Sequence, residues 1–279
     1  MKKMKRVAIF VLDGVGIGEM PDAGRYSDAG ADTLGHVIEK MEPDLPNLRE
    51  MGLYNIRGWA QGEEEPIGCF GKMAEKAAGK DTTSGHWELA GLTLETPFPT
   101  YPDGFPEELI REFEDAVGME VIGNKAASGT QIIEELGPEH LKTGKLIVYT
   151  SADSVFQIAA HESVIPPEEL WHICRVARSL LTGKNAVGRV IARPFAGEPG
   201  HFVRTANRRD FSVNPVGETM LDVLKNAGFD VLGVGKIEDI FNHRGLTQSN
   251  HAAGNEACMD AAMEFLKKDY WKGLMFVNL

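Results

Sequence analysis

The sequence predicts an α/β fold in which a parallel-sheet core is interrupted by an inserted domain at about residues 99–215. An unbroken apolar run near the N-terminus ends on Asp13 and opens into glycines, which is typical of a buried parallel strand. A helix-then-strand pattern at 219–234 repeats the alternation of the N-terminal part. Two proline-containing breaks, at 96–102 and 213–215, mark the ends of the insertion, because proline removes a backbone donor and fixes an extended path.

The predicted core consists of residues 1–98 and 216–279. Apolar runs bounded by glycines indicate its strands, and apolar residues at helical spacing bounded by prolines indicate its helices. In chain order we expect a central strand covered on both faces at 6–12, a helix at 33–41, a short helix at 86–92, a helix at 219–227, a strand at 229–234, a helix at 259–267 and a strand from 274.

The predicted insertion has its own alternation of helices and strands. Apolar and polar residues alternate with the helical period in two segments, and two short apolar runs rich in β-branched residues favour strands. In chain order we expect a helix at 107–117, a loop at 124–130, a strand at 146–150, a helix at 167–181 and a strand at 187–192.

Composition limits the class of protein. Of 279 residues, 43% are hydrophobic and the net charge is −12, which argues against a nucleic-acid partner because a phosphate backbone requires a basic face. The three cysteines, Cys69, Cys174 and Cys258, form no CxxC pair, so we expect reduced thiols in a cytoplasmic protein and no zinc site. No apolar stretch is long enough to cross a bilayer, so we expect no membrane partner. The oligomeric state is not indicated.

Asp13 is the first candidate for chemistry. It follows a predicted strand, and open parallel sheets bind ligands outside the carboxyl ends of their strands. The alternating glycines at 14, 16 and 18 allow the backbone to approach a phosphate or a metal closely. The alternative is a turn aspartate that caps the next element.

Thr82 is the second candidate, in the segment Gly-Lys-Asp-Thr-Thr-Ser-Gly-His-Trp-Glu at 79–88. Its hydroxyl is a poor nucleophile unless a divalent metal lowers the cost of ionisation, and Asp13 can supply a carboxylate to such a metal. A helix starting near Ser84 would offer backbone N–H groups to a phosphoryl oxygen. Asp81 and His86 are expected to support this loop, although a plain helix-capping loop remains the alternative.

Several motifs together resemble the phosphopentomutases of the bacterial, alkaline-phosphatase-superfamily type. The similarity extends over the whole chain and is carried by the segments 11–19 (VLDGVGIGE), 79–88 (GKDTTSGHWE), 124–130 (NKAASGT), 149–154 (YTSADS) and 188–195 (GRVIARPF). The resemblance implies an alkaline-phosphatase-like core, an inserted α/β cap domain, and interconversion of ribose or deoxyribose 1-phosphate and 5-phosphate. It also implies that Thr82 is phosphorylated, that Asp13 and Thr82 bind two manganese ions, and that a sugar bisphosphate is the activator.

The predicted cap carries candidate phosphate ligands. Arg189 and Arg193 lie four residues apart in a predicted strand, so both point to the same face, where two guanidinium groups suit a phosphate. Pairing with some of the many carboxylates is the alternative. Arg204 and Arg208 belong to a second basic group, with Lys236 close behind in sequence.

Two further residues are candidates for binding the sugar. Ser151 and Asp153 can hydrogen-bond its hydroxyl groups, although a role in a turn is nearly as plausible from their types alone. With the two basic groups, of which Lys236 lies in the predicted core, they make up the substrate site that we expect.

The resemblance also has a limit. The family continues beyond this chain, and its next segments carry the remaining metal ligands. We therefore expect the sequence to be incomplete at its C-terminus and the 279-residue chain alone to have little mutase activity. The alternatives are another phosphomutase or metal phosphatase of the superfamily, and a phosphosugar-binding fragment without activity.

Overall fold

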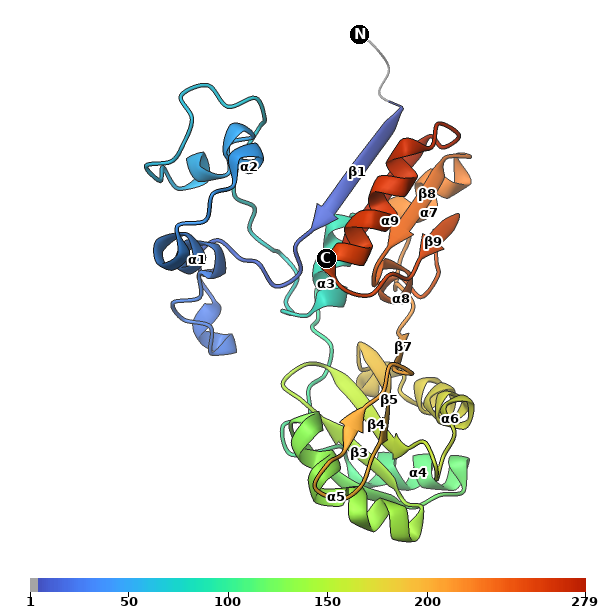
Figure 1. The fold of residues 1–279 in the computed structure, drawn as a ribbon. Helices are drawn as coiled ribbons and strands as arrows, with labels where there is room; N and C mark the ends of the chain where they lie inside the picture. Colours follow the sequence, from blue (N-terminus) through green and yellow to red (C-terminus); the bar gives the residue numbers. More distant parts are fainter. Residues whose placement is uncertain (1–4) are drawn as a thin grey trace. The chain divides into compact units, whose positions relative to one another are not determined.

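The computed structural model describes residues 5–279, which form two compact units. One unit contains Ala77–Leu279 and the residues before Val11, and the other contains Val11–Lys76. Figure 1 shows the elements, which are β1 (Arg6–Val11), α1 (Thr33–Met41), α2 (Pro46–Glu50), α3 (Thr82–Leu89), α4 (Glu107–Val117), β2 (Val121–Ala126), α5 (Gly129–Thr143), β3 (Leu146–Thr150), β4 (Val155–His161), α6 (Pro167–Leu180), β5 (Arg189–Ala196), β6 (Val203–Arg204), β7 (Arg209–Ser212), α7 (Met220–Asn226), β8 (Asp230–Val234), α8 (Ile237–Ile240), β9 (Gln248–Asn250), α9 (Asn255–Lys267) and β10 (Gly273–Asn278).

A four-stranded sheet in the order β1-β10-β8-β9 is built from both ends of the chain. The β10–β8 and β8–β9 pairs are parallel, as expected from the alternation of helices and strands. Ala262 and Phe265 of α9 pack against buried residues of β8 and β10, so this helix covers the sheet (Figure 1). The strands predicted near 229–234 and from 274 are thereby confirmed.

The prediction for the first strand is only partly right. β1 exists, but it lies at an edge of the sheet and not at its centre. Val7 and Phe10 are 44% and 40% exposed. The reason is that α7, α8 and α9 cover this sheet mainly over β8 and β10, whereas β1 meets α9 through Arg6, which donates to the carbonyl of Leu266 at 3.3 Å. The apolar character of the run indicated a strand, but not its neighbours.

A second, six-stranded sheet is built entirely from residues 121–212. Its order is β2-β3-β4-β5-β6, with β7 also paired to β5. The β2–β3 and β4–β5 pairs are parallel and the β3–β4 pair is antiparallel, so the sheet is mixed. Helices α4 and α6 share a buried cluster with one face, and α5 shares another with the opposite face (Figure 1).

The loop predicted at 124–130 is wrong. Residues 124–126 belong to β2, and α5 begins at Gly129. The strand was not predicted because Asn124 and Lys125 are polar and break the apolar pattern. It carries a register shift between Gly123 and Lys125. At the shift, Asn124 has a φ of 43°, and its side-chain amide bonds both the N–H and the carbonyl of Phe105. Tertiary contacts therefore impose the strand on a sequence that locally favours a turn.

Both sheets belong to the same compact unit. The molecule is thus an α/β protein with one parallel and one mixed sheet, whereas the division into a core and an inserted cap at 99–215 stays a prediction. In the smaller unit, α1 begins after Asp32, whose carboxylate accepts from the N–H of Gly35 at 3.2 Å, and it spans the residues predicted.

Candidate functional site

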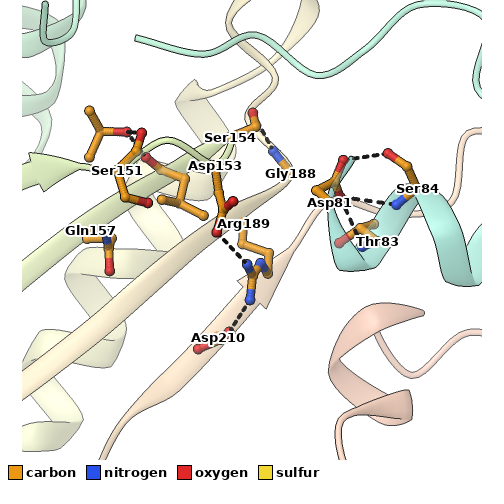
Figure 2. A network of polar contacts seen from close by, with 12 residues as sticks. Asp81, Thr83, Ser84, Ser151, Asp153, Ser154, Gln157, Gly188, Arg189 and Asp210 are labelled. Carbon is orange, nitrogen blue, oxygen red and sulfur yellow. Dashed lines mark hydrogen bonds and ion pairs between the residues drawn. The ribbon is translucent and has the colours of Figure 1, made fainter. Parts of the chain in front are cut away.

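Thr82 is the first residue of α3, and Asp81 fixes that position. The Asp81 carboxylate accepts from the N–H groups of Thr83 and Ser84 at 2.9 and 3.1 Å, and from the Ser84 hydroxyl at 2.5 Å (Figure 2). The helix therefore starts at Thr82, earlier than the sequence suggested, because a carboxylate at this position satisfies donors of the first turn.

His86 is buried one turn after Thr82 and joins α3 to the end of β10. Its Nδ1 lies 2.7 Å from the Thr82 carbonyl oxygen, and its Nε2 lies 3.1 Å from Nδ2 of Asn278. A carbonyl can only accept, so Nδ1 carries the proton and Nε2 accepts from the Asn278 amide. Asn278 was not singled out from the sequence, where it is only the last polar residue of an apolar strand.

Asp13 lies in a turn two residues after β1 ends. The N–H of Val15 donates to the carbonyl of Leu12 at 3.1 Å, and Gly14 has a φ of +81°, a value that glycine adopts without strain. The strand-tip position predicted for Asp13 is what the structure shows. Asp13 belongs to the unit 11–76 and Thr82 to the other unit.

The six-stranded sheet carries a second polar group, centred on Asp210 of β7. Arg189 of β5 reaches Asp210 at 3.3 Å and Asp153 at 3.9 Å (Figure 2). Arg208 donates to both oxygens of the same carboxylate, at 2.8 and 2.7 Å. Arg189 is thus paired with carboxylates, the alternative raised for it and Arg193, and Arg208 is paired in the same way. These pairs fix the two guanidinium groups in place.

Arg193 has different surroundings, four residues along β5. Its Nε donates to Oε1 of Gln157 at 3.1 Å, and burial, with the charges of Arg208 and Arg204 beside it, lowers its pKa. In the described part of the chain no carboxylate lies within ion-pair distance of Arg193 or Arg204. Of the predicted arginines, the structure therefore brings Arg193, Arg204 and Arg208 close to one another.

The remaining candidates are more dispersed. Ser151 and Asp153 follow β3, and the Ser154 hydroxyl accepts from the N–H of Gly188 at 3.3 Å (Figure 2). The same hydroxyl donates to the carbonyl of Pro99 at 2.5 Å. Lys236 immediately precedes α8, and its charge acts on the buried thiol of Cys258.

Neither a metal cluster nor a membrane helix is found among the residues described. Within residues 5–279 no group of three or more His, Cys, Asp or Glu side chains is arranged to hold an ion. None of the helices in that range is both long and apolar enough to cross a bilayer.

The structure thus shows an α/β protein with a capped helix start that bears a hydroxyl and a separate arginine cluster, and both features are chemically suited to phosphate groups. Comparison with known proteins gives the family. The chain is 59% identical to a phosphopentomutase from Caldanaerobacter subterraneus subsp. tengcongensis over 278 residues, 58% to one from Carboxydothermus hydrogenoformans over 279, and 56% to one from Acetivibrio thermocellus over 280. Each match covers 99% of this chain and 70–72% of the relative. No family model matches.

The chain therefore belongs to the phosphopentomutase family. The resemblance inferred from its motifs is confirmed, and so is the expectation of an enzyme of the phosphomutase type.

Proposed function

We propose that the family's interconversion of ribose or deoxyribose 1-phosphate and 5-phosphate proceeds through a phosphoryl group carried on Thr82, and that the 279 residues alone turn over little substrate. The observation that supports this most is the position of Thr82 as the first residue of a helix whose start is fixed by Asp81. A helix N-terminus carries partial positive charge, which stabilises a phosphate attached there.

The chain's own residues have separable tasks in this proposal. Asp81 takes up the N–H groups of Thr83 and Ser84, so it holds the turn and does not bind phosphate itself. His86 donates to the Thr82 carbonyl and is oriented by Asn278, so these two side chains hold the backbone of the nucleophile. Fixed placement of the hydroxyl favours attack because little conformational entropy remains to be lost on reaching the transition state.

We further propose that Asp13 and Thr82 are ligands of a manganese pair. A carboxylate and a hydroxyl are oxygen donors of the kind that this metal prefers, but two side chains make up only part of a coordination sphere, and the described residues hold no larger cluster. When bound, the metal would lower the cost of ionising the hydroxyl. A sugar bisphosphate is the proposed activator, since it can supply the first phosphoryl group.

The segment 99–215 is proposed to be the cap over the sugar, on an alkaline-phosphatase-like core. Shelter from water under a cap would favour transfer back to the sugar over hydrolysis of the phosphothreonine. The proposed substrate ligands in this segment are Ser151, Asp153, Arg189, Arg193, Arg204 and Arg208. Lys236 is the proposed substrate ligand from the core. A cytoplasmic location is also proposed, because Cys69, Cys174 and Cys258 are all free thiols.

Intact-mass spectrometry after incubation with manganese and a sugar bisphosphate tests the proposal. We expect the wild-type chain and Thr82→Ser to gain one phosphoryl group and Thr82→Ala to gain none. Thr83→Ala is the matched control, since the neighbouring hydroxyl is buried and should not be modified. Phosphorylation of Thr82→Ala, or of no variant at all, would contradict the mechanism. Release of inorganic phosphate without isomerisation of ribose 5-phosphate would indicate a phosphatase instead.

A further inference from the structure

The pairing of β5 with β6 and β7 is interrupted at Pro194. β6 ends at Arg204 and β7 begins at Arg209, and both pair antiparallel with β5. Between these two strands the chain has four residues, 205–208, opposite only two of β5. Pro194 has no N–H with which to continue the ladder, and its carbonyl accepts from the N–H of Thr205 at 3.1 Å. The four residues therefore form a bulge, which we call the 205–208 bulge.

The Glu162 side chain holds this bulge. Glu162 follows β4, and its own N–H donates to the carbonyl of Phe195 at 2.9 Å. Its Oε1 accepts from the Thr205 hydroxyl at 2.5 Å and from the side-chain amide of Asn207 at 2.9 Å. The hydrogen bonds from Thr205 and Asn207 lower the pKa of Glu162, so the carboxylate is ionised at neutral pH. One carboxylate oxygen thus ties two residues of the bulge to the end of β4.

Trp171 of α6 holds the bulge from a second element. Its Nε1 donates to the carbonyl of Asn207 at 3.0 Å. The guanidinium group of Arg209, which follows the bulge, lies over the Trp171 ring at 5.2 Å and over the Phe211 ring at 5.8 Å. Asn207 is therefore bonded through its side chain to Glu162 and through its carbonyl to Trp171.

Two of the proposed substrate ligands flank these contacts. Arg204 immediately precedes the 205–208 bulge, and Arg208 is its last residue. The charges of both act on Arg193, opposite the bulge on β5. A different path of the bulge would move both guanidinium groups relative to Arg193, because bulges redirect the side chains that they carry.

We propose that Glu162 and Trp171 are positioning residues, which hold the 205–208 bulge so that Arg204 and Arg208 meet the substrate in a fixed geometry. The inference rests on the proposed function only for the role of the two arginines as substrate ligands. The sign of the effect identifies its cause. Removal of the Glu162 charge alone would strengthen the binding of an anion, whereas loss of positioning weakens it.

Calorimetric titration with ribose 5-phosphate tests the inference. We expect about tenfold weaker binding by Glu162→Ala, whereas Glu162→Gln keeps an acceptor oxygen without the charge and should bind at least as tightly as the wild type. Trp171→Phe keeps a ring beside Arg209 but loses the donor to Asn207, so about threefold weaker binding is expected. Glu168→Ala, at an exposed glutamate of α6, is the charge-matched control and should bind as the wild type does.

A background that lacks both arginines separates positioning from a general loss of structure. In a variant with Arg204→Ala and Arg208→Ala, the further change Glu162→Ala should have no additional effect on binding, because no guanidinium group remains to be placed. If folded Glu162→Ala binds ribose 5-phosphate as tightly as the wild type or more tightly, the inference is wrong. Should Glu162→Ala fail to fold, Trp171→Phe decides, and wild-type affinity of that variant overturns the inference.

Amide hydrogen exchange distinguishes a failure of the inference from a failure of the proposed function. We expect faster exchange at residues 205–208 in Glu162→Ala and unchanged exchange there in Glu162→Gln. If the variant without Arg204 and Arg208 binds ribose 5-phosphate as the wild type does, the proposed substrate role of these arginines fails. Exchange then decides whether Glu162 holds the bulge, and equal exchange in Glu162→Ala and the wild type would show that it does not.

Discussion

At the scale of single residues, the start of α3 depends on the Asp81 carboxylate. This one side chain accepts from the N–H groups of Thr83 and Ser84 and from the Ser84 hydroxyl. Both Thr83 and Ser84 are buried. Donors buried in this way find no water to replace a lost partner. The position of Thr82 therefore depends on its neighbour.

Replacement of Asp81 by alanine should measure this dependence. We expect Asp81→Ala to lower the free energy of unfolding by about 1 kcal/mol, with a range of roughly 0.5–2 kcal/mol for lost N-caps. Asp81→Asn keeps an oxygen acceptor and should cost less. Urea denaturation provides the values, and equal stability of the wild type and Asp81→Ala would show that the cap contributes nothing.

A second effect at this scale concerns pH. His251 lies 2.6 Å from Asp239, and the hydrogen bond between them raises the pKa of the imidazole above 6.5, with burial opposing the rise. Because the folded state holds this proton more tightly, the pair contributes its full stabilisation below the unfolded pKa of 6.5 and loses it as the pH rises through the folded pKa.

His251→Asn should therefore reduce stability at about pH 6 and have little effect at about pH 9. Urea midpoints of the variant and the wild type at the two pH values give the comparison. His172→Asn, at an exposed position of α6, controls for the loss of an imidazole as such. If the loss of stability in His251→Asn were larger at about pH 9 than at about pH 6, the pair would not stabilise the fold through the protonated imidazole.

At the scale of elements, α4 and α6 were predicted closely, whereas α5 was not predicted and α9 begins at Asn255, four residues before its predicted start. α4 occupies the predicted residues and α6 ends one residue early, because their apolar residues recur at the helical period and proline precedes each start. The end of α6 depends on Arg178, which donates to the carbonyls of Val187, at 2.6 Å, and Leu181. Burial lowers the pKa of Arg178 to about 10.

Loss of Arg178 should thus loosen the connection between α6 and β5. We expect Arg178→Ala to cost about 2–3 kcal/mol, the range for hydrogen bonds from a charged donor together with lost packing. Arg175→Ala, one turn earlier and exposed, should stay within about 0.5 kcal/mol of the wild type. Thermal or urea denaturation of both variants gives the free energies of unfolding. If Arg178→Ala and Arg175→Ala lost similar stability, the hydrogen bonds of Arg178 would not hold the end of α6.

At the scale of the whole molecule, the six-stranded sheet has its own buried clusters. Phe105, Leu109 and Phe113 pack with β3, β4 and α6 on one face, and Ile132, Ile133 and Phe195 belong to the cluster on the other. Both clusters are drawn entirely from residues 101–211. A segment with complete clusters on both faces of its sheet has what an independent domain requires.

The fragment 99–215 should consequently fold alone, as an inserted domain must. We expect it to show a cooperative thermal transition by circular dichroism, whereas a shorter fragment starting at 121 should not, because it lacks α4 and so exposes one face of the sheet. A non-cooperative 99–215 fragment would argue against the proposed cap domain.

The sequence by itself determined the α/β class, the helices α4 and α6, and the family. It also placed Asp13 after a strand, because a strand end is a local feature, but it put the start of the next helix near Ser84 or His86, whereas α3 begins at Thr82. Only the tertiary structure decided that β1 is an edge strand, that 124–130 divides between β2 and α5, and that Asn278 contacts His86. These features depend on contacts between residues far apart in the chain, whose energies local composition does not encode.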